Sequence, residues 1–100
     1  MNQMQQMFAQ AKRMERELKN ARAALAEKEF VVKKAGIIEV TLKGNMTVQS
    51  IKIEKDAFEP DNKEMIEDTL AMAINEGLAQ IQAEADAIEQ RITGQSGLGF

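Results

Sequence analysis

Hydrophobic residues recur at alternating steps of three and four near the start of the chain. The apolar or small positions run from Met4 to Leu25 over three heptads, and neither glycine nor proline occurs before Gly36. This spacing places the apolar positions on one side of an α-helix and is typical of a coiled-coil seam. The pattern therefore predicts a long first helix whose apolar side packs against a neighbour.

From Glu29 the alternation of apolar and polar residues has a period of two, which indicates β-strands. Short glycine-containing turns between the strands favour an antiparallel meander. The predicted strands span residues 30–34, 37–43 and 46–54, with turns at Ala35-Gly36 and Gly44-Asn45.

The strand patterns also predict which side of the sheet is buried. Ile38, Val40 and Leu42 alternate with polar residues, so they share one face of the second strand. In the third strand the apolar positions change from even to odd numbers midway. A β-bulge near Gln49 and Ser50 would account for that change.

A second long helix is predicted after Pro60, which cannot continue a strand. Asp61 is expected to cap this helix, with Glu64 in the reciprocal position three residues later. The apolar seam spans Ile66–Ile92, and Gly94 just beyond it predicts the end of the helix.

The order of elements predicts an α+β fold, α-β-β-β-α, with a small three-stranded antiparallel sheet and two long helices. We expect one domain over residues 1–93 and a flexible C-terminal tail over residues 94–100, where three glycines occur in seven residues. A helix of about 28 residues is about 42 Å long, whereas strands of six or seven residues span only about 20–24 Å. Both helices should therefore extend beyond the sheet.

An apolar seam that extends beyond the sheet needs a cover, and a second copy of the same seam is the simplest one. We therefore expect a symmetric homodimer. The residues predicted to form the dimer contact are Met7, Met14, Leu18, Leu25, Leu78 and Ile81.

Charge is divided unevenly in this chain, whose formal net charge is -3. Residues 1–55 hold eleven Lys and Arg against six Asp and Glu, net +5, while residues 56–100 hold two against ten, net -8. Such asymmetry is a hint of an electrostatic partner, although a basic half can also face an acidic half of the same fold.

Several cations of the first helix fall on its outer side. With the heptad numbered from Met4, four of them take positions b, c and f, which face away from the seam. One interpretation is a solvated helix face with ion pairs one turn apart, such as Glu15 with Lys19. The other is a surface that contacts the phosphates of duplex DNA, which presents about one charge per 1.7 Å. The candidate DNA-binding residues are Lys12, Arg13, Arg16, Lys19 and Arg22.

The composition argues against an enzyme or a metalloprotein. The chain has no cysteine and no histidine, which removes thiolate and imidazole chemistry and most zinc sites. The acidic cluster at Glu64, Glu67 and Asp68 fits a helix N-terminus, and no ligand loop accompanies it. We therefore expect no catalytic residue, cofactor, metal or small-molecule substrate. No run approaches the roughly 18 apolar residues of a membrane span, so we expect a cytoplasmic protein with no membrane partner.

The segments "EVTLKGNMTVQSIKIEKDAF" and "DNKEMIEDTLAMAINEG", behind a Met- and Gln-rich first helix, resemble the YbaB/EbfC family of bacterial nucleoid-associated proteins. The resemblance covers residues 4–92. It implies a small cytoplasmic homodimer with a short sheet and projecting helices, shaped like tweezers, that binds DNA.

The leading hypothesis is a nucleoid-associated homodimer that binds double-stranded DNA through phosphate contacts. No base-reading motif is recognisable, so binding should be largely independent of DNA sequence. The alternative is a helical adaptor or chaperone-like dimer whose Met-rich groove or acidic helix binds another protein.

Overall fold

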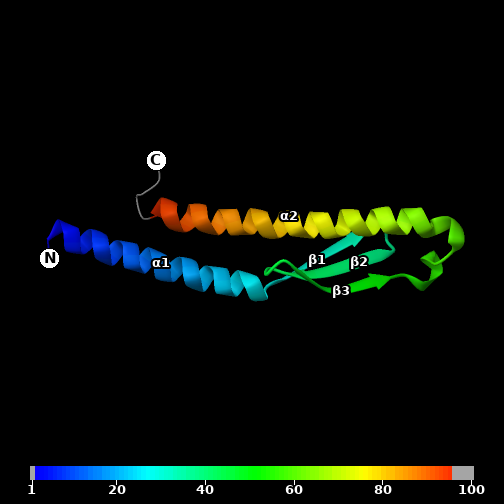
Figure 1. Ribbon diagram of the computed structural model, residues 1–100, viewed down its shortest axis with the longest axis horizontal. Coiled ribbons are helices and arrows are strands. Elements are labelled where there is room, and N and C mark those ends of the chain that lie inside the picture. Colours follow the sequence, from blue (N-terminus) through cyan, green and yellow to red (C-terminus); the bar gives the residue numbers. More distant parts are fainter. Residues whose placement is uncertain (1, 96–100) are drawn as a thin grey trace.

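The computed structural model describes residues 2–95 as a helix, a three-stranded sheet and a second helix (Figure 1). This confirms the predicted α+β order, α-β-β-β-α. The molecule is elongated, with principal extents of 71, 24 and 15 Å. The elements are α1 (Gln3–Glu27), β1 (Glu29–Lys34), β2 (Ile38–Lys43), β3 (Thr47–Ile53), the 3₁₀ turns η1 (Lys55–Ala57) and η2 (Pro60–Asn62), and α2 (Lys63–Gln95).

The first helix begins with a capping box that the sequence analysis did not anticipate. The Asn2 side chain accepts a hydrogen bond from the Gln5 backbone N–H at 2.8 Å, and the Gln5 side chain accepts one from the Asn2 N–H at 3.3 Å. Two backbone donors that a helix start leaves unpaired are thus satisfied. The cap stabilises the N-terminal turn of α1, which no other element within residues 2–95 covers.

The sheet is an antiparallel meander in the order β1-β2-β3. Residues 35–37 connect the paired residues Lys34 and Ile38, and the Ile37 N–H donates to the Lys34 carbonyl at 3.2 Å. Ala35 at φ 56° and Gly36 at φ 68° take the paired left-handed conformations that this tight turn requires. In the second hairpin Thr41 pairs with Ser50 and Leu42 with Val48, which leaves Gln49 as an extra residue. The β-bulge expected near Gln49 and Ser50 is therefore confirmed.

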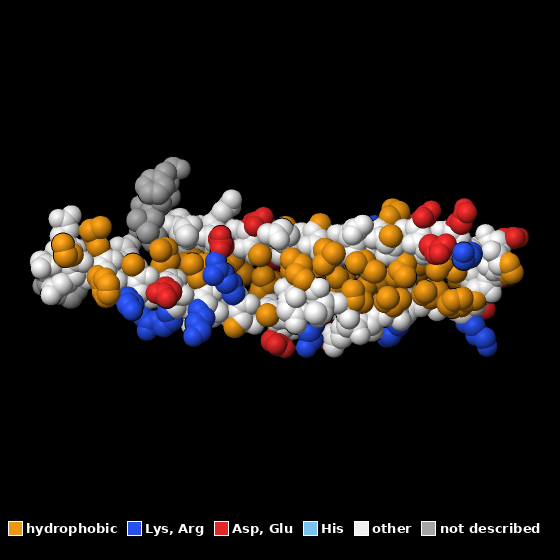
Figure 2. Space-filling view, in the orientation of Figure 1, with side chains coloured by type: hydrophobic (Ala, Val, Ile, Leu, Met, Phe, Trp, Pro, Cys, Tyr) orange, Lys and Arg blue, Asp and Glu red, His pale blue; other side chains and the backbone are white. Residues whose placement is uncertain are grey.

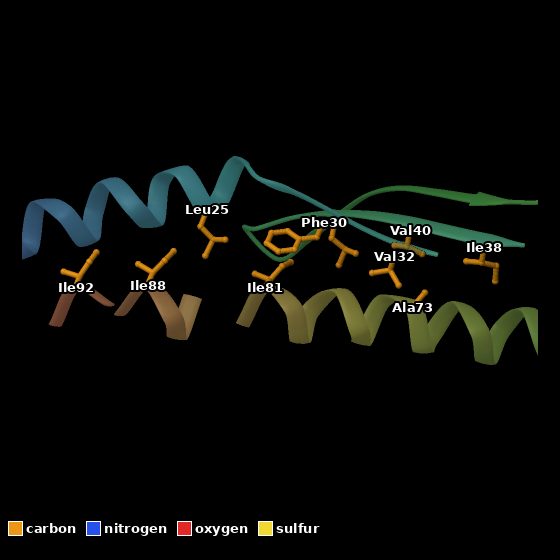
Figure 3. Close-up of a cluster of buried hydrophobic side chains, with 10 residues drawn as sticks. Leu25, Phe30, Val32, Ile38, Val40, Ala73, Ile81, Ile88 and Ile92 are labelled. Carbon is orange, nitrogen blue, oxygen red and sulfur yellow. The ribbon is translucent and has the colours of Figure 1, made fainter. Parts of the chain in front are cut away.

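One face of the sheet is buried under α2. Ile38, Val40 and Leu42 share this inner face, as predicted, and are almost fully buried. Figure 3 shows strand and helix side chains pointing towards one another across the interface. The buried hydrophobic cluster consists of Leu25, Phe30, Val32, Ile38, Val40, Leu42, Ala73, Ile81, Ile88 and Ile92.

Two glycines allow the backbones to approach closely. A Cβ atom added to Gly77 of α2 would lie 2.4 Å from Leu42 Cδ1, so the helix passes directly over β2 near its C-terminal end. A Cβ atom on Gly44 would lie 1.7 Å from the Leu25 carbonyl oxygen, and the Gly44 N–H donates to the Lys28 carbonyl at 2.9 Å. The β2–β3 turn is thereby fixed against the C-terminal end of α1.

The long α2 helix connects the two halves of the molecule. Its N-terminal half covers β1 and β2, and its C-terminal half lies alongside α1 (Figure 1). Ion pairs follow the same path, because Lys34 of β1 pairs with Glu76 at 2.6 Å and Lys28 pairs with Glu84 at 2.7 Å. Both helices extend beyond the sheet, as their lengths predicted.

The ends of α2 differ from the prediction. Asp61 does not cap the helix, because the Pro60–Asn62 segment closes its own 3₁₀ turn and α2 begins at Lys63. Gly94 does not end the helix either, since α2 continues to Gln95. Ile92 is buried against α1. The free energy gained by this packing exceeds the cost of about 1 kcal/mol that glycine carries in a helix relative to alanine. The rest of the predicted flexible tail, residues 96–100, lies outside the described residues.

Candidate nucleic-acid interface

Four exposed cations form a continuous ridge on the outer side of α1. Helical geometry of about 100° per residue places them within an arc of about 120°. Glu15 and Glu17 flank this arc on its two sides, and neither glutamate forms an ion pair with another described residue. We call this surface, made of Lys12, Arg13, Arg16 and Lys19, the α1 ridge.

The cations of the α1 ridge differ from most other Lys and Arg residues because no described acidic side chain forms an ion pair with them. Of the thirteen Lys and Arg residues, seven form ion pairs within residues 2–95. The six without an ion pair in that range are the four ridge residues, Lys55 and Arg91. The intrahelical pairs considered for the solvated interpretation, Glu15 with Lys19 among them, do not form.

Arg22 differs from the other candidate DNA-binding residues. Its guanidinium forms an ion pair with Glu89 across the contact between α1 and α2. Arg22 lies three residues after Lys19, about one helical turn beyond the ridge, where α2 already lies alongside α1. The ion pair helps to hold α1 and α2 together. Because Glu89 neutralises the guanidinium, Arg22 attracts an external anion less strongly than the ridge residues do.

Charge is separated between the two long helices. Figure 2 shows Lys and Arg side chains gathered along the outer edge of α1, while acidic side chains follow the edge of α2. Glu64, Asp68 and Asp86 of α2 are exposed and form no ion pair with another described residue. A polyanion approaching the molecule would therefore meet attraction at α1 and repulsion along α2.

The residues predicted to form the dimer contact fall into different environments. Leu25 and Ile81 are buried in the core of the single chain, so little of their surface is left for a second copy. Met14, Leu18 and Leu78 are half-buried at the edge of that core. Met7 is exposed on the part of α1 that α2 does not reach.

The inner face of β3 is left uncovered because α2 packs over β1 and β2. The side chains of Val48 and Ile51 lie on this inner face, since they pair with buried Leu42 and Val40, yet they are 43% and 44% exposed. Figure 2 shows hydrophobic side chains gathered in a band between α2 and the sheet.

The α2 side of this band follows from helical geometry. Glu76 pairs with β1, so Ile74 and Leu78, on the opposite flank of the helix, face towards β3. Both are half-buried. We call Val48, Ile51, Ile74 and Leu78 the apolar band.

Sequence reasoning missed most of the apolar band. The signal was present in the change of apolar parity along the third strand, which assigns Ile51 to the inner face after the bulge. The periodicity of apolar residues does not reveal that α2 covers only two of the three strands. That arrangement depends on the position of α2 over β2, which the close approach of Gly77 to Leu42 determines.

Other kinds of site are not indicated within residues 2–95. No group of three or more acidic side chains in this range is arranged to hold a metal ion. None of its helices combines the length and the apolar character needed to cross a membrane.

Comparison of the amino-acid sequence with known proteins identifies related proteins. The model of the YbaB/EbfC DNA-binding family matches residues 1–96. The chain is 33% identical to a nucleoid-associated protein of Enterococcus faecalis, over 87% of this chain and 85% of the relative. It is 34% identical to a nucleoid-associated protein of Agathobacter rectalis, over 97% of this chain and 87% of the relative. A nucleoid-associated protein of Lactobacillus acidophilus is 35% identical over 84% of this chain and 77% of its own length. The chain therefore belongs to the YbaB/EbfC DNA-binding family.

Proposed function

We propose that this protein is a non-enzymatic, nucleoid-associated DNA-binding protein of the cytoplasm that acts as a homodimer and contacts DNA phosphates largely without regard to base sequence. The observation that carries the proposal is the α1 ridge, four exposed cations without ion-pair partners among residues 2–95 in a protein whose net charge is -3.

The ridge fits a phosphate backbone better than it fits base edges. From Lys12 to Lys19 the helix rises about 10 Å, a length over which duplex DNA presents about six charges. Long flexible cations at the surface neutralise such charges and release counterions, which gives affinity without sequence information. The ridge holds only Lys and Arg, and none of the Asn, Gln, Asp or Glu side chains that read adenine or cytosine.

The apolar band supports a dimer. Val48 and Ile51 present aliphatic surface on the unpaired edge strand of the sheet, and Ile74 and Leu78 continue that surface on α2. Exposed apolar surface beside an unpaired strand edge favours association between chains. A second copy offers the same band, so a two-fold symmetric contact buries both at once.

The acidic exposure of α2 favours one orientation on DNA. Repulsion between phosphates and the carboxylates of α2 would keep that helix away from the duplex, while the α1 ridge is drawn towards it. In a dimer, two ridges would then be presented to nucleic acid.

Titration of two unrelated duplexes of equal length at two salt concentrations tests this proposal. The expected result is equal affinity for both duplexes and a steep loss of affinity at the higher salt concentration, because phosphate contacts dominate. A strong preference for one duplex would contradict phosphate-based binding. Absence of binding to both duplexes at low salt would overturn the proposal and leave the protein–protein adaptor as the better hypothesis.

A further inference from the structure

The N-terminal end of α1 carries an aromatic side chain that no other described element covers. Phe8 is 66% exposed, and its neighbours Met4 and Met7 are exposed as well. Cover by α2 begins further along α1, at half-buried Met14. The described chain thus provides no core for Phe8.

Helical geometry places Phe8 on the flank of α1 between the seam and the ridge. Lys12 and Lys19 follow it by four and eleven residues, so all three side chains lie within about 40° around the helix axis. The Lys12 ammonium nitrogen lies 5.5 Å from the centroid of the Phe8 ring. On the seam side, Met4 lies about 40° and Met7 about 100° from Phe8 around the axis. The ring therefore borders the ridge, within reach of a partner that binds Lys12 and Lys19.

We propose that Phe8 is a base-contacting wedge: when the α1 ridge binds duplex phosphates, the Phe8 ring enters the groove and packs against the bases. The inference rests on the proposed function, since the unpaired cations beside the ring identify a polyanion as the occupant of this surface. DNA-binding proteins of several kinds insert apolar side chains at base steps, and aromatic rings stack on bases without sequence preference. The contact adds affinity that does not depend on counterion release.

A tryptophan at position 8 reports directly on this contact, because the chain has no tryptophan or tyrosine of its own. The variant Phe8→Trp should show strong quenching of its fluorescence when saturated with duplex DNA, as expected for an indole ring packed on bases. The matched control is Phe58→Trp, since Phe58 is 64% exposed but lies beyond the sheet, far from the ridge. Its emission should be unchanged by DNA.

Two outcomes of the tryptophan experiment would overturn the proposal. Unchanged emission of Phe8→Trp in a complex that demonstrably forms would show that the ring stays in water. A blue shift that appears with protein concentration in the absence of DNA would show that a second copy covers the ring.

The salt dependence of binding separates failure of this inference from failure of the proposed function. Phe8→Ala should lower duplex affinity by about 5-fold to 150-fold at every salt concentration, with the slope of log K against log salt unchanged. Lys12→Gln should instead flatten the slope by about 0.9 for each subunit that engages the duplex. If Phe8→Ala binds as tightly as the wild type while Lys12→Gln flattens the slope, the wedge is refuted and the phosphate contacts stand. If the wild type does not bind DNA, both proposals fail.

Discussion

Substitution of Val48 and Ile51 by threonine should weaken dimerisation without unfolding the chain. Threonine keeps the β-branched shape that suits a strand, and both positions are already partly in water in the single chain. In a dimer built on the apolar band, however, each hydroxyl would replace apolar contact and lose hydration.

The expected size of the effect follows from the exposed fractions. Complete burial of a Val or Ile side chain contributes roughly 1.5–3 kcal/mol. The exposed 43% and 44% leave about 0.6–1.3 kcal/mol for each side chain to gain on association. Two side chains in two copies sum to about 2.5–5 kcal/mol, equivalent to about 70-fold to 5,000-fold in the dimer dissociation constant. We expect the double variant to lose at least tenfold, roughly 1.4 kcal/mol.

Sedimentation velocity over a range of protein concentrations measures this change. The matched control is Val31→Thr, because Val31 is 50% exposed but lies on the opposite face of the sheet. The control should dimerise like the wild type. Equal dissociation constants for the double variant and the wild type, or equal weakening by the control, would refute the assignment of the dimer contact to the apolar band.

Three further predictions concern single positions. Gly77→Ala should lower the free energy of unfolding, measured with denaturant, by about 1–2 kcal/mol, because the added Cβ would overlap buried Leu42. Gly94→Ala should be neutral or stabilising, because open space surrounds that position. The reverse order of stabilities would contradict the packing of α2 on β2. Ala35→Asn should raise stability by about 0.5–1 kcal/mol, because asparagine tolerates the left-handed conformation better than alanine, and an unchanged or lower melting temperature would count against this. Arg22→Gln should change the salt slope of DNA binding by less than about 0.9, since an ion pair with α2 already neutralises Arg22; a full change would show that the pair opens on DNA.

Features that depend on local pattern were predictable from the sequence. The order of elements, the buried face of β2 and the β-bulge at Gln49 all follow from periodicity, because side chains on a strand alternate and a slip in parity requires an extra residue. The exposure of the four ridge cations likewise follows from their heptad positions.

Features that depend on contacts between distant segments were not predictable. The C-terminal end of α2 extends past Gly94 because Ile92 packs on α1, and local helix signals do not include that contact. Leu25 and Ile81 look like surface seam residues in the heptad pattern, but the chain uses them in its own core. Arg22 looks like a fifth ridge cation until α2 brings Glu89 beside it. In each case a partner from another element decides the role of the residue.

The salt dependence of duplex binding by two triple variants tests most directly whether the α1 ridge contacts DNA phosphates. The first variant carries glutamine in place of Lys12, Arg16 and Lys19. The control carries glutamine in place of three exposed lysines on and beside the sheet, Lys33, Lys52 and Lys55. Both variants lose the same total charge, so a difference between them reports on position and not on net charge.

The ridge variant should flatten the slope of log K against log salt by about 2.7 for each subunit that engages the duplex, because each lost phosphate contact removes about 0.9. The control should keep the slope of the wild type, and both variants should melt like the wild type. A ridge variant that binds with the wild-type slope at every salt concentration would contradict the central claim and leave the α1 ridge as a solvated helix surface.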